Sequence, residues 1–149
     1  MHIQTQINGN KIEIIQAGSS DKSVIRNLMQ LYQYESTDYS GDDPDQHGYF
    51  DYPYLDHYWT EEGQMEERRL PLLLKVNGNL AGFILINNHT VYLEQGEDTY
   101  TIAEFFVLKN GENKESAVRQ PASFSAGSRE HGKSGQKGIT ILPIRSGAR

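Results

Sequence analysis

Two apolar runs around a short polar turn decide how this chain folds: Leu70-Pro-Leu-Leu-Leu-Lys-Val76, then Asn77-Gly78-Asn79, then Leu80-Ala-Gly-Phe-Ile-Leu-Ile86. Apolar runs of this length are typical of buried strands. Asparagine and glycine between them favour the positive φ angles of a tight hairpin turn. The stretch therefore predicts an antiparallel hairpin over residues 70–86.

The sequence before this hairpin predicts a second hairpin and a helix. An Asn8-Gly9 turn folds Ile3–Ile7 back on a strand at Lys11–Gln16. Ser20 and Asp21 are N-cap residues for a helix that we expect to end near Tyr34. Its apolar positions keep helical spacing: Val24, Ile25, Leu28, Met29, Leu31 and Tyr32.

The next segment, Glu35–Asp56, is rich in Asp, Gly, Tyr and Pro and predicts a long loop of the kind that carries function. Tyr54–Trp59 predicts a short helix, and Thr99–Leu108 predicts a further strand. The order is therefore strand, helix, loop with a short helix, and three strands. This order predicts an α/β (α+β) domain with a mixed, largely antiparallel sheet flanked by helices.

The composition changes after Lys109. Residues 1–110 carry seven Lys/Arg and seventeen Asp/Glu, a net charge of 7 − 17 = −10. Residues 111–149 carry seven basic and three acidic residues, a net charge of 7 − 3 = +4, and hold only one of the fifteen aromatic residues, Phe124. Such a composition buries too little apolar surface to offset chain entropy, so we expect residues 110–149 to be poorly ordered.

The whole chain has the length of one globular domain. It has no cysteine, which suits a reducing compartment, and no apolar run near the roughly 20 residues of a membrane span. Met1-His-Ile-Gln-Thr-Gln6 lacks the features of a secretory signal. We therefore expect a soluble cytoplasmic protein without a membrane partner. The formal charge of −6 argues against nucleic-acid binding.

Three strings give the chain a family resemblance: Asp21-Lys-Ser-Val-Ile-Arg-Asn-Leu-Met-Gln-Leu-Tyr32, Leu74-Lys-Val-Asn-Gly-Asn-Leu-Ala-Gly-Phe83 and Ile102-Ala-Glu-Phe-Phe-Val-Leu-Lys109. Over residues 1–109 the chain resembles the GNAT superfamily of acyl-CoA-dependent N-acetyltransferases. The resemblance implies transfer of an acetyl group from acetyl-CoA, used as cosubstrate without a metal, to a primary amine of a small molecule or peptide. The sequence is also compatible with a homodimer.

The resemblance also implies roles for particular residues. Backbone groups of the last strand would bind the pantetheine arm of acetyl-CoA, and the cofactor-binding residues would be Phe106, Val107, Leu108 and Lys109. Glu104 is the candidate base, because an ammonium must lose a proton before it attacks a thioester. Alternation along the strand predicts that Glu104 and Phe106 share one face and that Phe105 lies on the other. The candidate substrate contacts are Tyr32, Tyr34, Glu35 and Tyr58. For each of these side chains a structural role is the alternative.

The chain departs from the family after Lys109. The family has an Arg/Gln-x-x-Gly-x-Gly/Ala loop there, which binds the pyrophosphate, and this chain continues Asn110-Gly-Glu-Asn-Lys-Glu-Ser-Ala-Val-Arg119. Codons read one base out of register from Asn110 allow the string KWRKQGVGRAAA, which contains Arg-x-x-Gly-x-Gly. We therefore hypothesise a frameshifted, aberrant tail over 110–149 and expect acetyl-CoA binding by this chain to be weak or absent.

The sequence also contains patterns that are typical of other kinds of site. Gly127–Ser134 matches the P-loop pattern GxxxxGK[ST], but neither a buried strand nor an amphipathic helix flanks it. The acidic residues 42–57 fail the calcium-loop pattern, because Tyr54 stands where a bidentate Glu is needed when Asp43 is the first ligand. A non-catalytic α/β binding module with a disordered basic tail is the main alternative.

Overall fold

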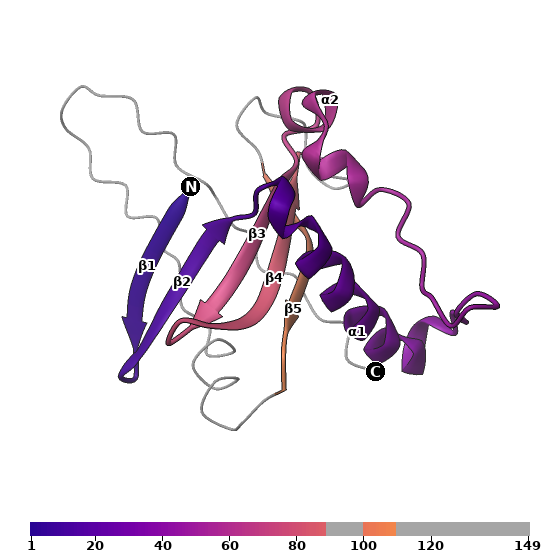
Figure 1. Cartoon of the computed structure of the whole chain (residues 1–149), viewed down its shortest axis with the longest axis horizontal. Coiled ribbons are helices and arrows are strands. Elements are labelled where there is room, and N and C mark those ends of the chain that lie inside the picture. Colours follow the sequence, from indigo (N-terminus) through magenta and orange to yellow (C-terminus); the bar gives the residue numbers. More distant parts are fainter. Residues whose placement is uncertain (89–99, 110–149) are drawn as a thin grey trace.

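A computed structural model describes residues 1–88 and 100–109 of the 149-residue chain. Five antiparallel strands form one sheet in the order β1-β2-β3-β4-β5. The strands are β1 (His2–Ile7), β2 (Asn10–Gln16), β3 (Leu70–Val76), β4 (Asn79–Asn87) and β5 (Thr101–Val107). With the long helix α1 (Lys22–Ser40), they make an α+β fold (Figure 1).

Both predicted hairpins are confirmed. Asn8 and Gly9 have φ angles of 50° and 77° between β1 and β2, and Asn77 and Gly78 have 51° and 78° between β3 and β4. Two successive positive φ angles give a turn whose backbone twist matches the right-handed twist of the two strands that it joins. The dipeptide Asn-Gly, which tolerates these angles, therefore sets both pairings.

The helix differs from its prediction at both ends. We predicted an end near Tyr34, but α1 continues to Ser40 and ends at Gly41, whose φ of 72° is left-handed. The apolar pattern stops earlier because the last turns of α1 project into solvent. At the start, Asp21 precedes α1 but its carboxylate accepts the Gly18 N–H at 3.0 Å, so it does not cap α1 itself.

The segment after α1 contains less loop than predicted. The residues 41–55 form no regular helix or strand, and the short helix predicted at Tyr54–Trp59 is the 3-10 turn η2 (Asp56–Trp59). A second short helix, α2 (Glu61–Met65), was not predicted. Another 3-10 turn, η1 (Ser19–Asp21), leads into α1.

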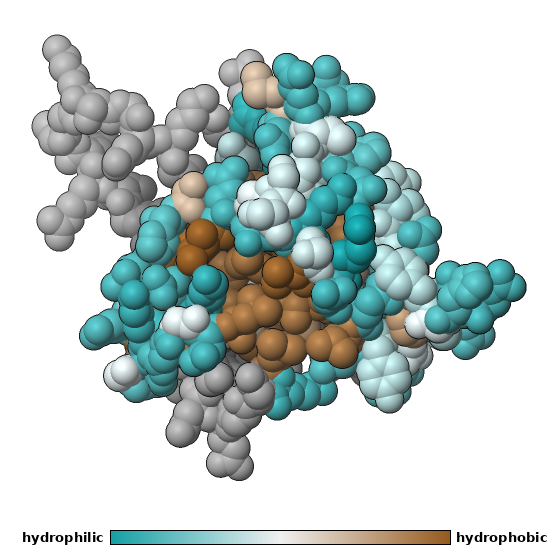
Figure 2. All heavy atoms as spheres, in the orientation of Figure 1, coloured by the Kyte–Doolittle hydropathy of each residue, from teal (hydrophilic) through white to brown (hydrophobic). Residues whose placement is uncertain are grey.

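The two faces of the sheet differ in what covers them. On one face, Ile25, Leu28 and Met29 of α1 pack with the buried strand residues Leu73, Phe83, Leu85 and Phe106. The apolar clusters of the other face, such as that of Leu72, Ile84 and Ile86, contain no helix residue among the part of the chain described. Figure 2 shows hydrophobic side chains gathered near the middle of the molecule beside α1. The helix therefore covers only part of the sheet.

Candidate functional site

The centre of the candidate site is Glu104, the acidic side chain of β5. Its carboxylate accepts a short hydrogen bond from the Tyr32 hydroxyl at Oε2, and the Tyr52 hydroxyl donates to Oε1 at 3.0 Å. Each carboxylate oxygen therefore has one phenol donor. An ionised carboxylate accepts on both oxygens, so lone pairs remain for a third group.

Three separate parts of the chain bring these groups together. Glu104 pairs with Leu85 in the β4–β5 ladder, and its neighbour Phe105 is 41% exposed on the opposite side of the strand. This confirms the predicted alternation. Tyr32 lies on α1, where its ring packs edge-on against Phe83 and Phe106 with centroids 5.9 Å away in both cases. Aromatic packing therefore aims its hydroxyl at Glu104.

Tyr52 comes from the irregular segment after α1. Gln30 of α1 holds that segment, because its amide donates to the carbonyl oxygen of Phe50 and accepts the Phe50 N–H, both at 2.8 Å. Gln33 donates to the carbonyl oxygen of Asp51 at 3.2 Å. These contacts bring Tyr52 to Glu104 across 52 residues of sequence.

The two phenols are held in their protonated form. Burial is the largest cause that raises the pKa of Tyr32, and the hydrogen bond to Glu104 and its negative charge raise it further. Burial is also the largest cause of the raised pKa of Tyr52, followed by the charge of Glu104. At neutral pH both hydroxyls are therefore hydrogen-bond donors to the carboxylate.

Tyr52 also lines an open pocket of about 390 Å³. Its wall includes Tyr52 together with Arg26, Tyr49, Asp51, Pro53, Leu55 and Asp56. Asp56 binds both Arg26 and Lys22 at 2.9 Å, so the positive charge of Arg26 is neutralised within the wall. These side-chain pairs, chiefly that with Lys22, keep the pKa of Asp56 below its usual value.

Two of the predicted site residues bind one another. Lys109 Nζ, predicted to contact the cofactor, lies 3.1 Å from Oε1 of Glu35, predicted to contact the substrate. Both side chains are partly solvent-exposed, and exposed ion pairs of this kind typically contribute only about 0–1 kcal/mol. The pair joins the end of β5 to α1. The roles of the two residues remain predictions.

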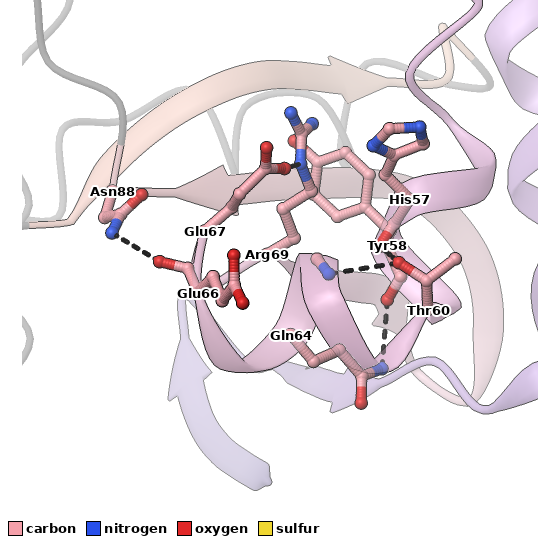
Figure 3. A network of polar contacts seen from close by, with 9 residues as sticks. His57, Tyr58, Thr60, Gln64, Glu66, Glu67, Arg69 and Asn88 are labelled. Atoms are coloured by element: carbon pink, nitrogen blue, oxygen red, sulfur yellow. Dashed lines mark hydrogen bonds and ion pairs between the residues drawn. The ribbon is translucent and has the colours of Figure 1, made fainter.

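The other two predicted substrate contacts lie in opposite environments. Tyr34 is 69% exposed on α1, whereas Tyr58 is fully buried in the core cluster under α1. The Arg69 guanidinium lies 5.1 Å from the centre of the Tyr58 ring and forms an ion pair with Glu67. Figure 3 shows this arrangement, in which Gln64 also donates to the Tyr58 carbonyl oxygen at 3.0 Å. Tyr58 therefore presents no surface to a ligand in this structure.

The backbone of β5 separates the predicted pantetheine contacts. The Leu108 N–H donates to the carbonyl oxygen of Ala81 at 2.7 Å, and successive residues of an antiparallel pair point their backbone groups in opposite directions. Phe106 and Leu108 therefore bond toward β4, while Val107 points its N–H and C=O away from it. Among the described strands β5 is an edge, so of these three residues Val107 presents backbone groups there.

Some predictions concern residues that the structure does not describe, and others concern metal ligands and membrane-spanning helices. The whole tail 110–149, with its missing pyrophosphate loop and its P-loop match at 127–134, lies outside them. Within 1–88 and 100–109, no three His, Asp or Glu side chains are grouped as metal ligands would be. No helix in the same ranges is long and apolar enough to cross a bilayer.

Tyr52 and its pocket were missed from the sequence. Tyr52 stands among Tyr49, Tyr54 and several aspartates, and nothing in that pattern distinguishes it from its neighbours. A comparison with protein-family models finds no match for this chain, and a comparison with curated protein sequences finds none either.

Proposed function

We infer that residues 1–109 derive from a GNAT-type N-acetyltransferase, which transfers the acetyl group of acetyl-CoA to a primary amine. The observation that carries the proposal is Glu104, a carboxylate on β5 that faces α1, accepts two phenol hydroxyls and adjoins a pocket through Tyr52. The order of strands and helix is the order that the family resemblance implies. The proposal includes two features of the family: the last strand splays from its neighbour, and a phosphate loop follows that strand.

In the proposed reaction Glu104 accepts the proton that the amine loses. The neutral amine nitrogen then attacks the thioester carbonyl and the C–N bond forms. The C–S bond breaks, and the second proton lost from the nitrogen ends on the leaving CoA thiolate. Val107 would hydrogen-bond the pantetheine arm through its outward backbone groups. The two phenol donors support this role because they fix the position of the carboxylate, as a general base requires.

The function proposed for the ancestral protein must be distinguished from the function of this exact chain. The sequence of the tail 110–149 lacks the family's Arg/Gln-x-x-Gly-x-Gly/Ala motif, so this chain is expected to bind acetyl-CoA weakly or not at all. Reading the gene with one base restored near codon 110 is expected to return that loop.

The test is an acetyl-transfer assay on the frame-restored protein, with release of CoA as the readout. Glu104→Gln keeps the shape of the side chain but removes the base, and we expect a rate lower by about 100-fold or more. Asp43→Asn, an exposed acidic residue of the irregular segment, is the control and is expected to keep the rate. A Glu104→Gln rate equal to that of the parent would contradict the role of Glu104.

One observation favours a second candidate, a non-catalytic binding module. The basic composition of residues 110–149 is that of a disordered tail rather than a cofactor loop. If the coding sequence excludes the restored frame, the tail is authentic and this candidate moves ahead. A nucleotide-binding protein that uses the P-loop match would lose ATP binding on Lys133→Ala, and we expect no ATP binding to be lost.

A further inference from the structure

Tyr52 belongs to two sites at once. Its hydroxyl donates to Oε1 of Glu104 at 3.0 Å, and its side chain also lines the open pocket. A movement of this one ring therefore changes both the pocket wall and the hydrogen bonding of the carboxylate. Tyr32, by contrast, contacts Glu104 from within a regular helix and packs on two core rings.

A glutamate side chain needs two contacts to fix its plane. The last torsion of glutamate is broad and roughly two-fold, so a single donor leaves the carboxylate free to turn. Tyr32 binds Oε2 and Tyr52 binds Oε1, and together they define the orientation of the carboxylate. The orientation in turn sets where the remaining lone pairs point and therefore which approaching group can give up a proton.

Gln30 controls the position of Tyr52 without touching it. Its amide satisfies both backbone groups of Phe50, as a neighbouring strand would do, in a segment that has no regular structure of its own. Phe50 stands two residues before Tyr52. A chain of contacts therefore runs from Gln30 through the Phe50 backbone and Tyr52 to Glu104.

We propose that Tyr52, held in place by Gln30, is a positioning residue that fixes the orientation of the Glu104 carboxylate and so the direction from which an amine can give it a proton. The reference to an amine rests on the proposed function, whereas the contact chain does not. Charged and titratable groups on several elements lie near Tyr52. Tyr32 is on α1, Glu104 on β5, Tyr58 on η2, and the pocket wall adds Arg26, Asp51 and Asp56.

The test is an ultraviolet absorbance titration of the nine tyrosines in the full chain as it exists. Tyr32 and Tyr52 are expected in the group that ionises well above the usual pH for tyrosine. Tyr52→Phe is expected to remove one tyrosine from this late group. Glu104→Gln is expected to move both Tyr32 and Tyr52 to lower pH, because it removes the negative charge and replaces one of the two acceptor oxygens with an amide NH2.

Gln30→Ala is the decisive variant. It keeps all nine tyrosines, yet it is expected to move one of them from the late group toward the ordinary group, because the released segment exposes Tyr52. Gln30→Glu, which retains the acceptor but loses the donor to Phe50, serves if the alanine variant does not fold. Circular dichroism at each pH checks that the fold persists.

Two results would overturn the proposal. A Gln30 variant whose tyrosines titrate as in the parent would show that Gln30 does not hold Tyr52. A Tyr52→Phe variant that loses a tyrosine from the ordinary group would show that Tyr52 is not bound to Glu104. Because no acetyl-CoA is present, either failure is distinct from failure of acetyl transfer.

Discussion

At the scale of single residues, the two tyrosines that bind Glu104 make the free energy of unfolding depend on pH in the alkaline range. Both tyrosines have a raised pKa in the folded state, while the unfolded value is about 10. The folded state thus holds these protons more tightly. The stability that they contribute is fully present below about pH 10 and is lost as the pH rises through the folded values.

The double variant Tyr32→Phe/Tyr52→Phe has neither ionisation, so its free energy of unfolding should fall less between about pH 9 and about pH 11 than that of the parent. Urea denaturation at the two pH values measures the difference. Tyr34→Phe/Tyr39→Phe is the matched control, because these side chains are 69% and 80% exposed. Equal slopes for the parent and the first double variant would contradict the account.

The sequence could predict residues of this site only where a pattern constrained them. Strand alternation was enough to place Glu104 and Phe106 on one face, and this is confirmed by the register of β5. Tyr52 could not be predicted, because its contact depends on how Gln30 holds an irregular segment. Tyr58 has the same residue type in a similar context, yet it is fully buried.

At the scale of elements, β4 and β5 approach too closely for a side chain at Gly82. A Cβ atom there would lie 2.0 Å from the carbonyl oxygen of Phe106. Gly82→Ala should therefore force the two strands apart and reduce the free energy of unfolding by about 1–3 kcal/mol. The measurement is the urea midpoint of the variant against that of the parent.

Gly18→Ala is the control for this variant. A Cβ at Gly18 would meet nothing closer than 3.9 Å, and its φ of −77° suits any residue. The change should stay within about 0.5 kcal/mol of the parent. If Gly82→Ala proved equally mild, the close packing of β4 on β5 at the candidate site would be wrong.

The short helix α2 depends on one cap. Thr60 Oγ1 accepts the Gly63 N–H and donates to the carbonyl oxygen of His57, both at 3.0 Å. Thr60→Ala should reduce the free energy of unfolding by about 1 kcal/mol, whereas Thr60→Ser keeps the hydroxyl and should lose much less. Equal urea midpoints for the two variants would show that the cap contributes nothing.

Elements were predicted well where turn chemistry or apolar spacing marked them. The Asn-Gly turns fixed two hairpins, and the apolar spacing located the buried face of α1. The last turns of α1 were missed because their residues, from Glu35 onward, are polar and solvent-exposed or only partly buried. Short α2 was missed because it has only five residues and little apolar pattern.

At the scale of the whole molecule, α1 packs on part of one face of a five-stranded sheet in the described residues. The proposed family has a phosphate loop after its last matching strand, and the sequence after Lys109 lacks the Arg/Gln-x-x-Gly-x-Gly/Ala motif of that loop. This mismatch between the first 109 residues and the rest is the central feature of the chain.

The most direct measurement is a calorimetric titration of acetyl-CoA into the frame-restored protein, with the present chain titrated beside it. We predict saturable binding near micromolar concentration by the restored protein and weak or no binding by the present chain. A restored protein that folds but does not bind acetyl-CoA would contradict the proposed function. Tight binding by the present chain would contradict the need for the phosphate loop.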